Sequence, residues 1–186
     1  DALPILASTC INVLSLTIFV AFNYGLIART SQAFGAKNLT LVGEYLHKAA
    51  LIYGILAIPS CTILWYSNKI FLLLEFDENI ARNAHKICSA SLPGILGFIG
   101  FNTLTAFLNG CDLFKPPAII QTISAVIYSL IAYITISLLD MGIEGVAISF
   151  NIQHCLALVM IIIYIKEVDP VPGGLFWFTE NSFNNC

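Results

Sequence analysis

Charged side chains are scarce in this sequence. Only 10% of its 186 residues are Asp, Glu, Lys or Arg, whereas soluble domains carry about 25%. Apolar residues make up 58% of the chain, and the mean hydropathy is +0.87. A soluble fold of this length would have too few charges to cover so large an apolar core. The composition therefore indicates an integral membrane protein.

A basic surface and a metal-ligand motif are also lacking. The 8 Lys and Arg residues are outnumbered by 11 Asp and Glu residues, which gives a formal net charge of −3. Proteins that bind nucleic acid hold the phosphate backbone with a basic surface, so we expect no nucleic-acid partner. The 6 cysteines are scattered, without a Cys-x-x-Cys motif or a nearby pair of histidines. We therefore expect no metal site.

Motifs of catalysis are missing as well. The sequence has no Gly-x-Ser-x-Gly elbow, no His-Glu-x-x-His, no P-loop and no pair of carboxylates within an apolar run. We therefore expect neither enzyme activity nor a cofactor. The chain begins at Asp1 without a signal-peptide pattern, and we expect a segment upstream of it to be missing.

Long charge-free runs define the expected fold. A bilayer core about 30 Å thick needs about 20 apolar residues in a helix, and a helix satisfies its own backbone polar groups in lipid. The runs predict five transmembrane helices, at residues 2–28, 49–67, 87–111, 116–139 and 145–165. The fold class is thus an all-α integral membrane bundle over residues 1–167. Residues 168–186, in which Pro170, Pro172, Gly173 and Gly174 precede a polar tail, are predicted to be a linker.

The basic residues and the prolines refine this bundle. If the connection between the first two spans is cytoplasmic, that side holds five basic residues and the opposite side three, as the positive-inside rule favours. Pro59 and Pro93 lie inside predicted spans. Each proline either kinks a packed helix or marks irregular backbone beside a cavity.

Polar residues within the spans are almost all neutral. No Asp, Glu, Lys or Arg lies in the middle of a span, although such residues usually mark ion or proton pathways in membranes. His154 is the one histidine deep in a span. It either takes part in proton coupling or is a neutral, hydrogen-bonded side chain that faces another helix.

Several short motifs follow one another in a specific order. Gly25-Leu26 precedes the run Ser31 to Asn38, Pro116 opens the fourth span, and Gly142-x-x-Gly145-Val146-Ala147 opens the fifth. This ordered set resembles the multidrug and toxic compound extrusion (MATE) transporters over nearly the whole chain. The resemblance implies an antiporter of twelve helices in two six-helix lobes. Members export organic, often cationic, compounds or xenobiotics in exchange for protons or sodium.

The resemblance also implies an incomplete protein. The chain would supply helices two to six of the first lobe, and residues 168–186 would lead towards a missing second lobe of the same chain. Its partners would be the lipid bilayer, a small organic substrate and the coupling proton or sodium ion. The protein would be a multi-pass protein of the plasma membrane or of a vacuolar or other organelle membrane. Two alternatives are a lipid-linked precursor flippase of the same superfamily, and a short membrane scaffold or decayed paralogue without transport activity.

Some positions depart from the family pattern and bear on the site. Ile27 and Ala28 stand where many eukaryotic members have an acidic residue and Thr, and Tyr128 stands where an Asn or His is common. A tyrosine adds an aromatic face suited to a cation. We predict a substrate cavity lined by polar residues of the later spans, with ordinary interhelical hydrogen bonding as the alternative. The candidates are Asn102, Thr105, Gln121, Tyr128 and Asn151.

Overall fold

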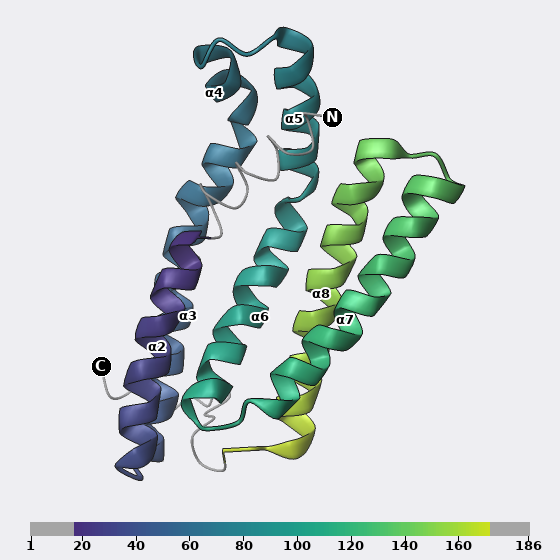
Figure 1. The fold of residues 1–186 in the computed structure, drawn as a ribbon. Coiled ribbons are helices and arrows are strands. Elements are labelled where there is room, and N and C mark those ends of the chain that lie inside the picture. Colours follow the sequence, from purple (N-terminus) through teal and green to yellow (C-terminus); the bar gives the residue numbers. More distant parts are fainter. Residues whose placement is uncertain (1–16, 172–186) are drawn as a thin grey trace.

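The computed structural model describes residues 17–171, and all regular structure within that range is helical. Long helices lie side by side and are joined by short turns at the two ends of the bundle (Figure 1). This confirms the predicted all-α fold class. The helices are α2 (Thr17–Gly35), α3 (Leu39–Trp65), α4 (Ser67–Leu73), α5 (Glu78–Ala90), α6 (Leu92–Gly110), α7 (Lys115–Tyr133), the π-helix η2 (Ile134–Leu138) and α8 (Gly142–Val168).

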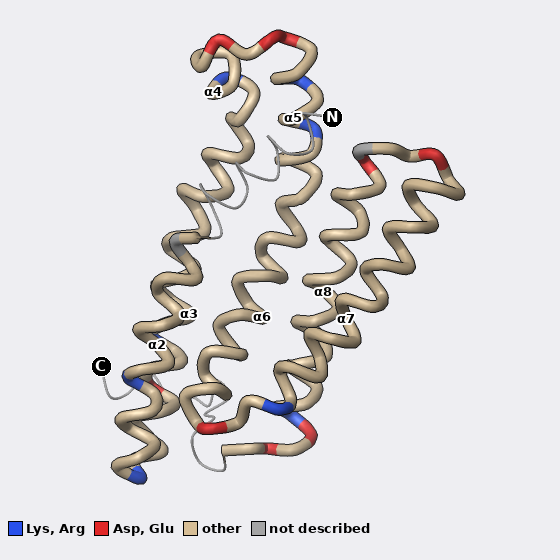
Figure 2. Tube along the Cα trace, in the orientation of Figure 1, with Lys and Arg blue, Asp and Glu red and all other residues tan. Residues whose placement is uncertain are grey.

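Four of the described helical segments are long and apolar enough to cross a membrane. They are Leu39–Trp65, Leu92–Gly110, Lys115–Leu138 and Glu144–Val168. Figure 2 shows the charged residues near the two ends of the bundle, with the helix middles almost free of them. The predicted span 2–28 lies partly outside the described residues, and so does most of the predicted linker 168–186.

The connection between α2 and α3 is much shorter than expected. The charge-free runs placed a connection from Arg29 to Lys48, but α2 continues to Gly35 and α3 already begins at Leu39. The Asn38 side chain caps α3 by accepting a hydrogen bond from the backbone nitrogen of Leu41 at 3.1 Å. Charged residues are compatible with the wet end of a membrane helix, so a charge-free run underestimates the length of the helix.

The predicted span 87–111 is divided in the structure. α5 ends at Ala90, and α6 begins at Leu92 with a proline in its first turn. Pro93 has no backbone N–H, so the carbonyl of Ser89 loses its usual donor four residues ahead. Pro59, in contrast, lies inside α3, which continues to Trp65. Only one of the two prolines thus coincides with the end of a helix.

Glycines allow α6 and α8 to approach closely. A Cβ atom placed on Gly97 would lie 2.9 Å from the backbone nitrogen of Cys155 and 2.9 Å from the carbonyl carbon of His154. One placed on Gly94 would lie 2.5 Å from the side-chain oxygen of Asn151. Small residues commonly mark such contacts between membrane helices. The contact fixes which face of α8 is turned towards α6.

A buried hydroxyl pair joins the end of α7 to α8. The hydroxyl of Thr135 in η2 lies 3.1 Å from that of Ser149, which donates to the carbonyl of Gly145 at 2.7 Å. Both side chains are buried. Because α8 also packs against α6, the three helices α6, α7 and α8 form one packed group.

Candidate substrate cavity

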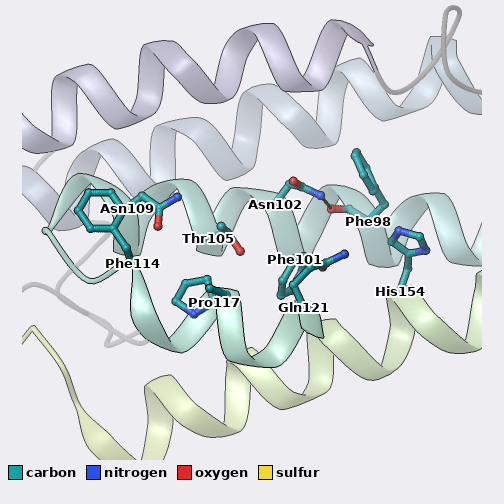
Figure 3. A pocket seen from close by; sticks show the side chains of 10 residues that line it. Phe98, Phe101, Asn102, Thr105, Asn109, Phe114, Pro117, Gln121 and His154 are labelled. Atoms are coloured by element: carbon teal, nitrogen blue, oxygen red, sulfur yellow. Dashed lines mark hydrogen bonds between the residues drawn. The ribbon is translucent and has the colours of Figure 1, made fainter. Parts of the chain in front are cut away.

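A cavity of about 360 Å³ lies among α6, α7 and α8. Figure 3 shows Asn109 and Phe114 near one end of it and Phe98 and His154 near the other. The lining combines neutral polar side chains with aromatic rings, which is the usual character of small-molecule sites. The lining residues are Phe98, Phe101, Asn102, Thr105, Asn109, Phe114, Pro117, Ala118, Gln121 and His154.

Helix α6 contributes a polar stripe. Asn102, Thr105 and Asn109 follow one another at spacings of three and four residues, which places them on one face of a helix. The amide nitrogen of Asn102 donates to the carbonyl of Phe98 at 2.9 Å. Its amide oxygen makes no hydrogen bond with the described residues, so it remains an acceptor for a ligand.

Thr105 carries an unpaired hydroxyl. Its oxygen is buried and has no hydrogen-bond partner among the residues that the structure describes. An unpaired buried hydroxyl costs free energy, about 1–3 kcal/mol by mutational measures. A ligand or water in the cavity would remove that cost, because Thr105 lines it.

Helix α7 supplies the opposite wall through Pro117, Ala118 and Gln121. Pro117 belongs to the first turn of the helix, where the missing N–H of a proline removes no helical hydrogen bond. The amide of Gln121 makes no hydrogen bond within residues 17–171, so it offers both a donor and an acceptor to the cavity.

His154 brings a ring from α8. Its centroid lies 5.3 Å from that of Phe98 and 4.3 Å from that of Phe150. Its Nδ1 lies 2.9 Å from the carbonyl oxygen of Phe150. A carbonyl only accepts, so Nδ1 carries the hydrogen and donates it. The neutral ring then keeps Nε2, at its far tip, as an acceptor.

No Asp, Glu, Lys or Arg is among the lining residues. The described part of the chain also contains no group of three or more His, Cys, Asp or Glu that would hold a metal ion. The cavity therefore presents hydrogen-bonding groups and aromatic faces without a fixed charge. This combination suits recognition of an organic molecule by shape and hydrogen bonding.

The five candidates from the sequence lie in three places. Asn102, Thr105 and Gln121 line the cavity together. Tyr128 is half-buried on α7 and is not part of the lining. Asn151 bonds to the backbone around the break between α5 and α6 instead. Asn109 is not one of the five candidates, but it continues the helical spacing of Asn102 and Thr105 and lines the cavity with them.

Asn151 takes the place of one backbone hydrogen bond. Its side-chain oxygen accepts from the backbone nitrogen of Gly94 at 2.8 Å, and its amide nitrogen donates to the carbonyl of Ala90 at 2.7 Å. In an unbroken helix Gly94 would donate directly to Ala90, four residues earlier. The side chain of Asn151, from α8, is thus inserted where the backbone hydrogen bonds between α5 and α6 are interrupted. Such an insertion is a known cause of kinks.

Comparison with known proteins places this bundle in a family. The MatE family model matches residues 6–134. The chain belongs to the MatE family. The structure agrees with that of the eukaryotic MATE transporter AtDTX14, with a TM-score of 0.88 over 96% of this chain and 40% of that one, at 18% sequence identity. This MatE chain is therefore a multi-pass membrane protein with the MATE fold.

Relatives of this MatE chain are considerably longer. It is 26% identical to Protein DETOXIFICATION 9 of Arabidopsis thaliana, over 87% of this chain and 34% of the relative. It is 24% identical to Multidrug and toxin extrusion protein 1 of Xenopus tropicalis, over 86% of this chain and 28% of the relative. The chain thus spans about a third of the length of these curated relatives.

Proposed function

We propose that this chain forms part of the first lobe of a secondary antiporter that exports organic, often cationic, compounds in exchange for protons or sodium. The cavity among α6, α7 and α8 would be the contribution of this lobe to the substrate path. The observation that carries the proposal is this neutral, aromatic-lined cavity within a MatE-family bundle. Relatives named as multidrug and toxin extrusion proteins support an organic substrate.

The lining explains how such a substrate would be held. Aromatic rings attract the charge of an organic cation through their faces, and Phe98, Phe101 and Phe114 supply three rings. Thr105 and Gln121 supply unpaired hydrogen-bonding groups. Because no carboxylate of the described residues lines the cavity, no ion pair with them dominates binding, which favours tolerance of varied substrates.

A transport assay tests the proposal. The full-length protein that contains this segment is expressed in cells that lack their own drug pumps, and ethidium efflux is followed by fluorescence. Gln121→Ala and Thr105→Val should each raise the substrate concentration needed for half-maximal efflux by roughly two- to tenfold, because a net hydrogen bond is worth about 0.5–1.5 kcal/mol.

Thr122→Val is the matched control. Thr122 is the neighbour of Gln121 on α7, is exposed, and donates only to its own helix at Ala118, with an oxygen–oxygen distance of 2.9 Å. Its efflux should match that of the wild type. Absence of organic-cation efflux in the wild type under both a proton and a sodium gradient would refute the proposed function.

A further inference from the structure

Among the lining residues, His154 is the one of a type that can change charge near neutral pH. The other nine lining residues are Phe, Asn, Thr, Pro, Ala and Gln, and none of these types titrates in that range. We infer that His154 is the group of this cavity that exchanges a proton for an organic cation. The inference rests on the proposed function and adds the group that couples the two movements.

The hydrogen bond of His154 determines where the proton enters. Nδ1 already donates to the carbonyl of Phe150, so the free lone pair is on Nε2. Protonation therefore occurs at the tip of the ring rather than at the helix backbone. The ring lies beside Phe98 at one end of the cavity (Figure 3). A positive charge gained there is placed next to the space that a cationic substrate would occupy.

Aromatic contacts make the protonated state tolerable. The rings of Phe98 and Phe150 lie within 5.3 Å and 4.3 Å of the imidazole centroid. Aromatic rings attract a cation within about 6 Å of their centroid. The same kind of ring would attract the organic cation, so proton and substrate would use similar interactions in turn.

Within residues 17–171, no titratable group other than His154 lines the cavity. The elements packed against α8 are α5, α6, α7 and η2, and α6 and η2 carry no titratable side chain. On α7 the titratable residues are Lys115, Tyr128 and Tyr133. On α5 they are Glu78, Arg82, His85, Lys86 and Cys88. On α8 itself they are Glu144, Cys155, Tyr164, Lys166 and Glu167.

Because no carboxylate is among the described lining residues, the proton and the organic cation compete for the cavity. A protonated His154 has no negative partner in the cavity, so its charge repels an incoming cation. When the cation binds, Nε2 releases its proton to water, and when the cation leaves, Nε2 takes up another. One proton is then exchanged for one monovalent organic cation. By linkage, the proton weakens cation binding by the same factor as the cation weakens proton binding.

Binding of tetraphenylphosphonium measures this competition, because the charge of this cation does not vary with pH. The probe is titrated into the purified full-length protein between pH 5.5 and 8.0. The wild type should bind more weakly as pH falls through the acidic range in which the imidazole of His154 gains its proton. The loss should approach about tenfold per pH unit on the acid side, as expected for competition with one proton.

Two variants of His154 remove the titrating group. His154→Gln keeps a hydrogen-bonding amide near the position of Nε2, and His154→Asn keeps a donor for the Phe150 carbonyl. Both should bind the probe with an affinity that hardly changes with pH. His85→Gln is the control, because His85 lies on α5, hydrogen-bonds with Ser67 and does not line the cavity. It should retain the slope of the wild type.

The outcomes separate the two proposals. A wild type that neither binds nor exports organic cations refutes the proposed function. A wild type that binds the probe with a pH-independent affinity overturns the role of His154, as does a folded His154→Gln or His154→Asn protein that keeps the wild-type slope. Each variant is first checked by size-exclusion chromatography. Only a variant that elutes at the same volume as the wild type, and is therefore folded, is used to judge the role of His154.

Discussion

Replacing Asn151 with alanine removes the side chain that joins α8 to the break between α5 and α6. The variant loses the bonds to the Gly94 nitrogen and to the Ala90 carbonyl, at 2.8 Å and 2.7 Å. Hydrogen bonds contribute about 0.5–1.5 kcal/mol each in net terms, and interhelical bonds in a membrane average about 0.6 kcal/mol. For the pair we expect a loss of about 1–3 kcal/mol in the free energy of unfolding.

Reversible unfolding of the full-length protein in mixed detergent and SDS micelles measures this loss. Gln153→Ala is the matched control, because it removes an amide two residues further along the same helix. Gln153 makes no hydrogen bond within the described part of the chain, so its replacement should change the free energy of unfolding by less than about 0.5 kcal/mol.

Asn151→Asp separates the two hydrogen bonds. A carboxylate keeps an acceptor for the Gly94 nitrogen but places an oxygen against the Ala90 carbonyl, where a donor is required. We therefore expect Asn151→Asp to be at least as unstable as Asn151→Ala. If Asn151→Ala unfolds with the same free energy as Gln153→Ala, the side chain does not support the break and the reasoning is wrong.

Four further predictions follow from the packing and the topology. Gly97→Ala should destabilise the protein by about 1–3 kcal/mol by forcing α6 from α8, whereas Gly54→Ala, where a Cβ atom meets nothing within 4 Å, should be neutral or stabilising; thermal unfolding compares them. Thr135→Val should cost about 1 kcal/mol in the same assay, because it removes the bond to Ser149; an unchanged melting temperature would contradict this. Asn38 should carry no glycan despite its Asn-Leu-Thr sequon if the α2–α3 turn is cytoplasmic, and a mobility shift with glycosidase would reverse the orientation. Liposomes that hold only residues 1–186 should show no gradient-driven efflux, because alternating access needs one lobe to move against another; saturable exchange would refute this.

Hydropathy predicted the apolar middles of the helices but not their ends. α3 begins at Leu39, ten residues before the predicted span, because its first turns tolerate the exposed pair of Glu44 and Lys48. These two side chains lie 3.2 Å apart at a spacing of four residues, which supports a helix rather than a loop. A search for charge-free runs excludes such turns by construction.

The sequence around each proline could not predict that the helix continues through Pro59 but is interrupted at Pro93. Both prolines lack a backbone N–H, yet only Pro93 coincides with a helix boundary. The group that satisfies the nearby backbone is Asn151, which is 57 residues from Gly94 along the chain. Only tertiary packing brings these residues together.

The candidate site was predictable where one helix decides the geometry. Asn102 and Thr105 share a face of α6, so helical spacing alone brings them to the same cavity. The rotation of α8 depends on its contact with Gly94 and Gly97, and this contact turns Asn151 towards α6. The alternatives for Asn151 therefore stayed open until the packing of α6 against α8 was known.

The amide inserted between Ala90 and Gly94 also has an evolutionary consequence. A substitution at Asn151 leaves two backbone groups without their partner, one at the end of α5 and one in the first turn of α6, and a side chain at Gly94 would collide with the amide. Neither position is free to drift alone. We expect the residues at positions 94 and 151 to have changed together during evolution. Related proteins in which α5 and α6 form one unbroken helix should therefore lack an asparagine at the position of Asn151.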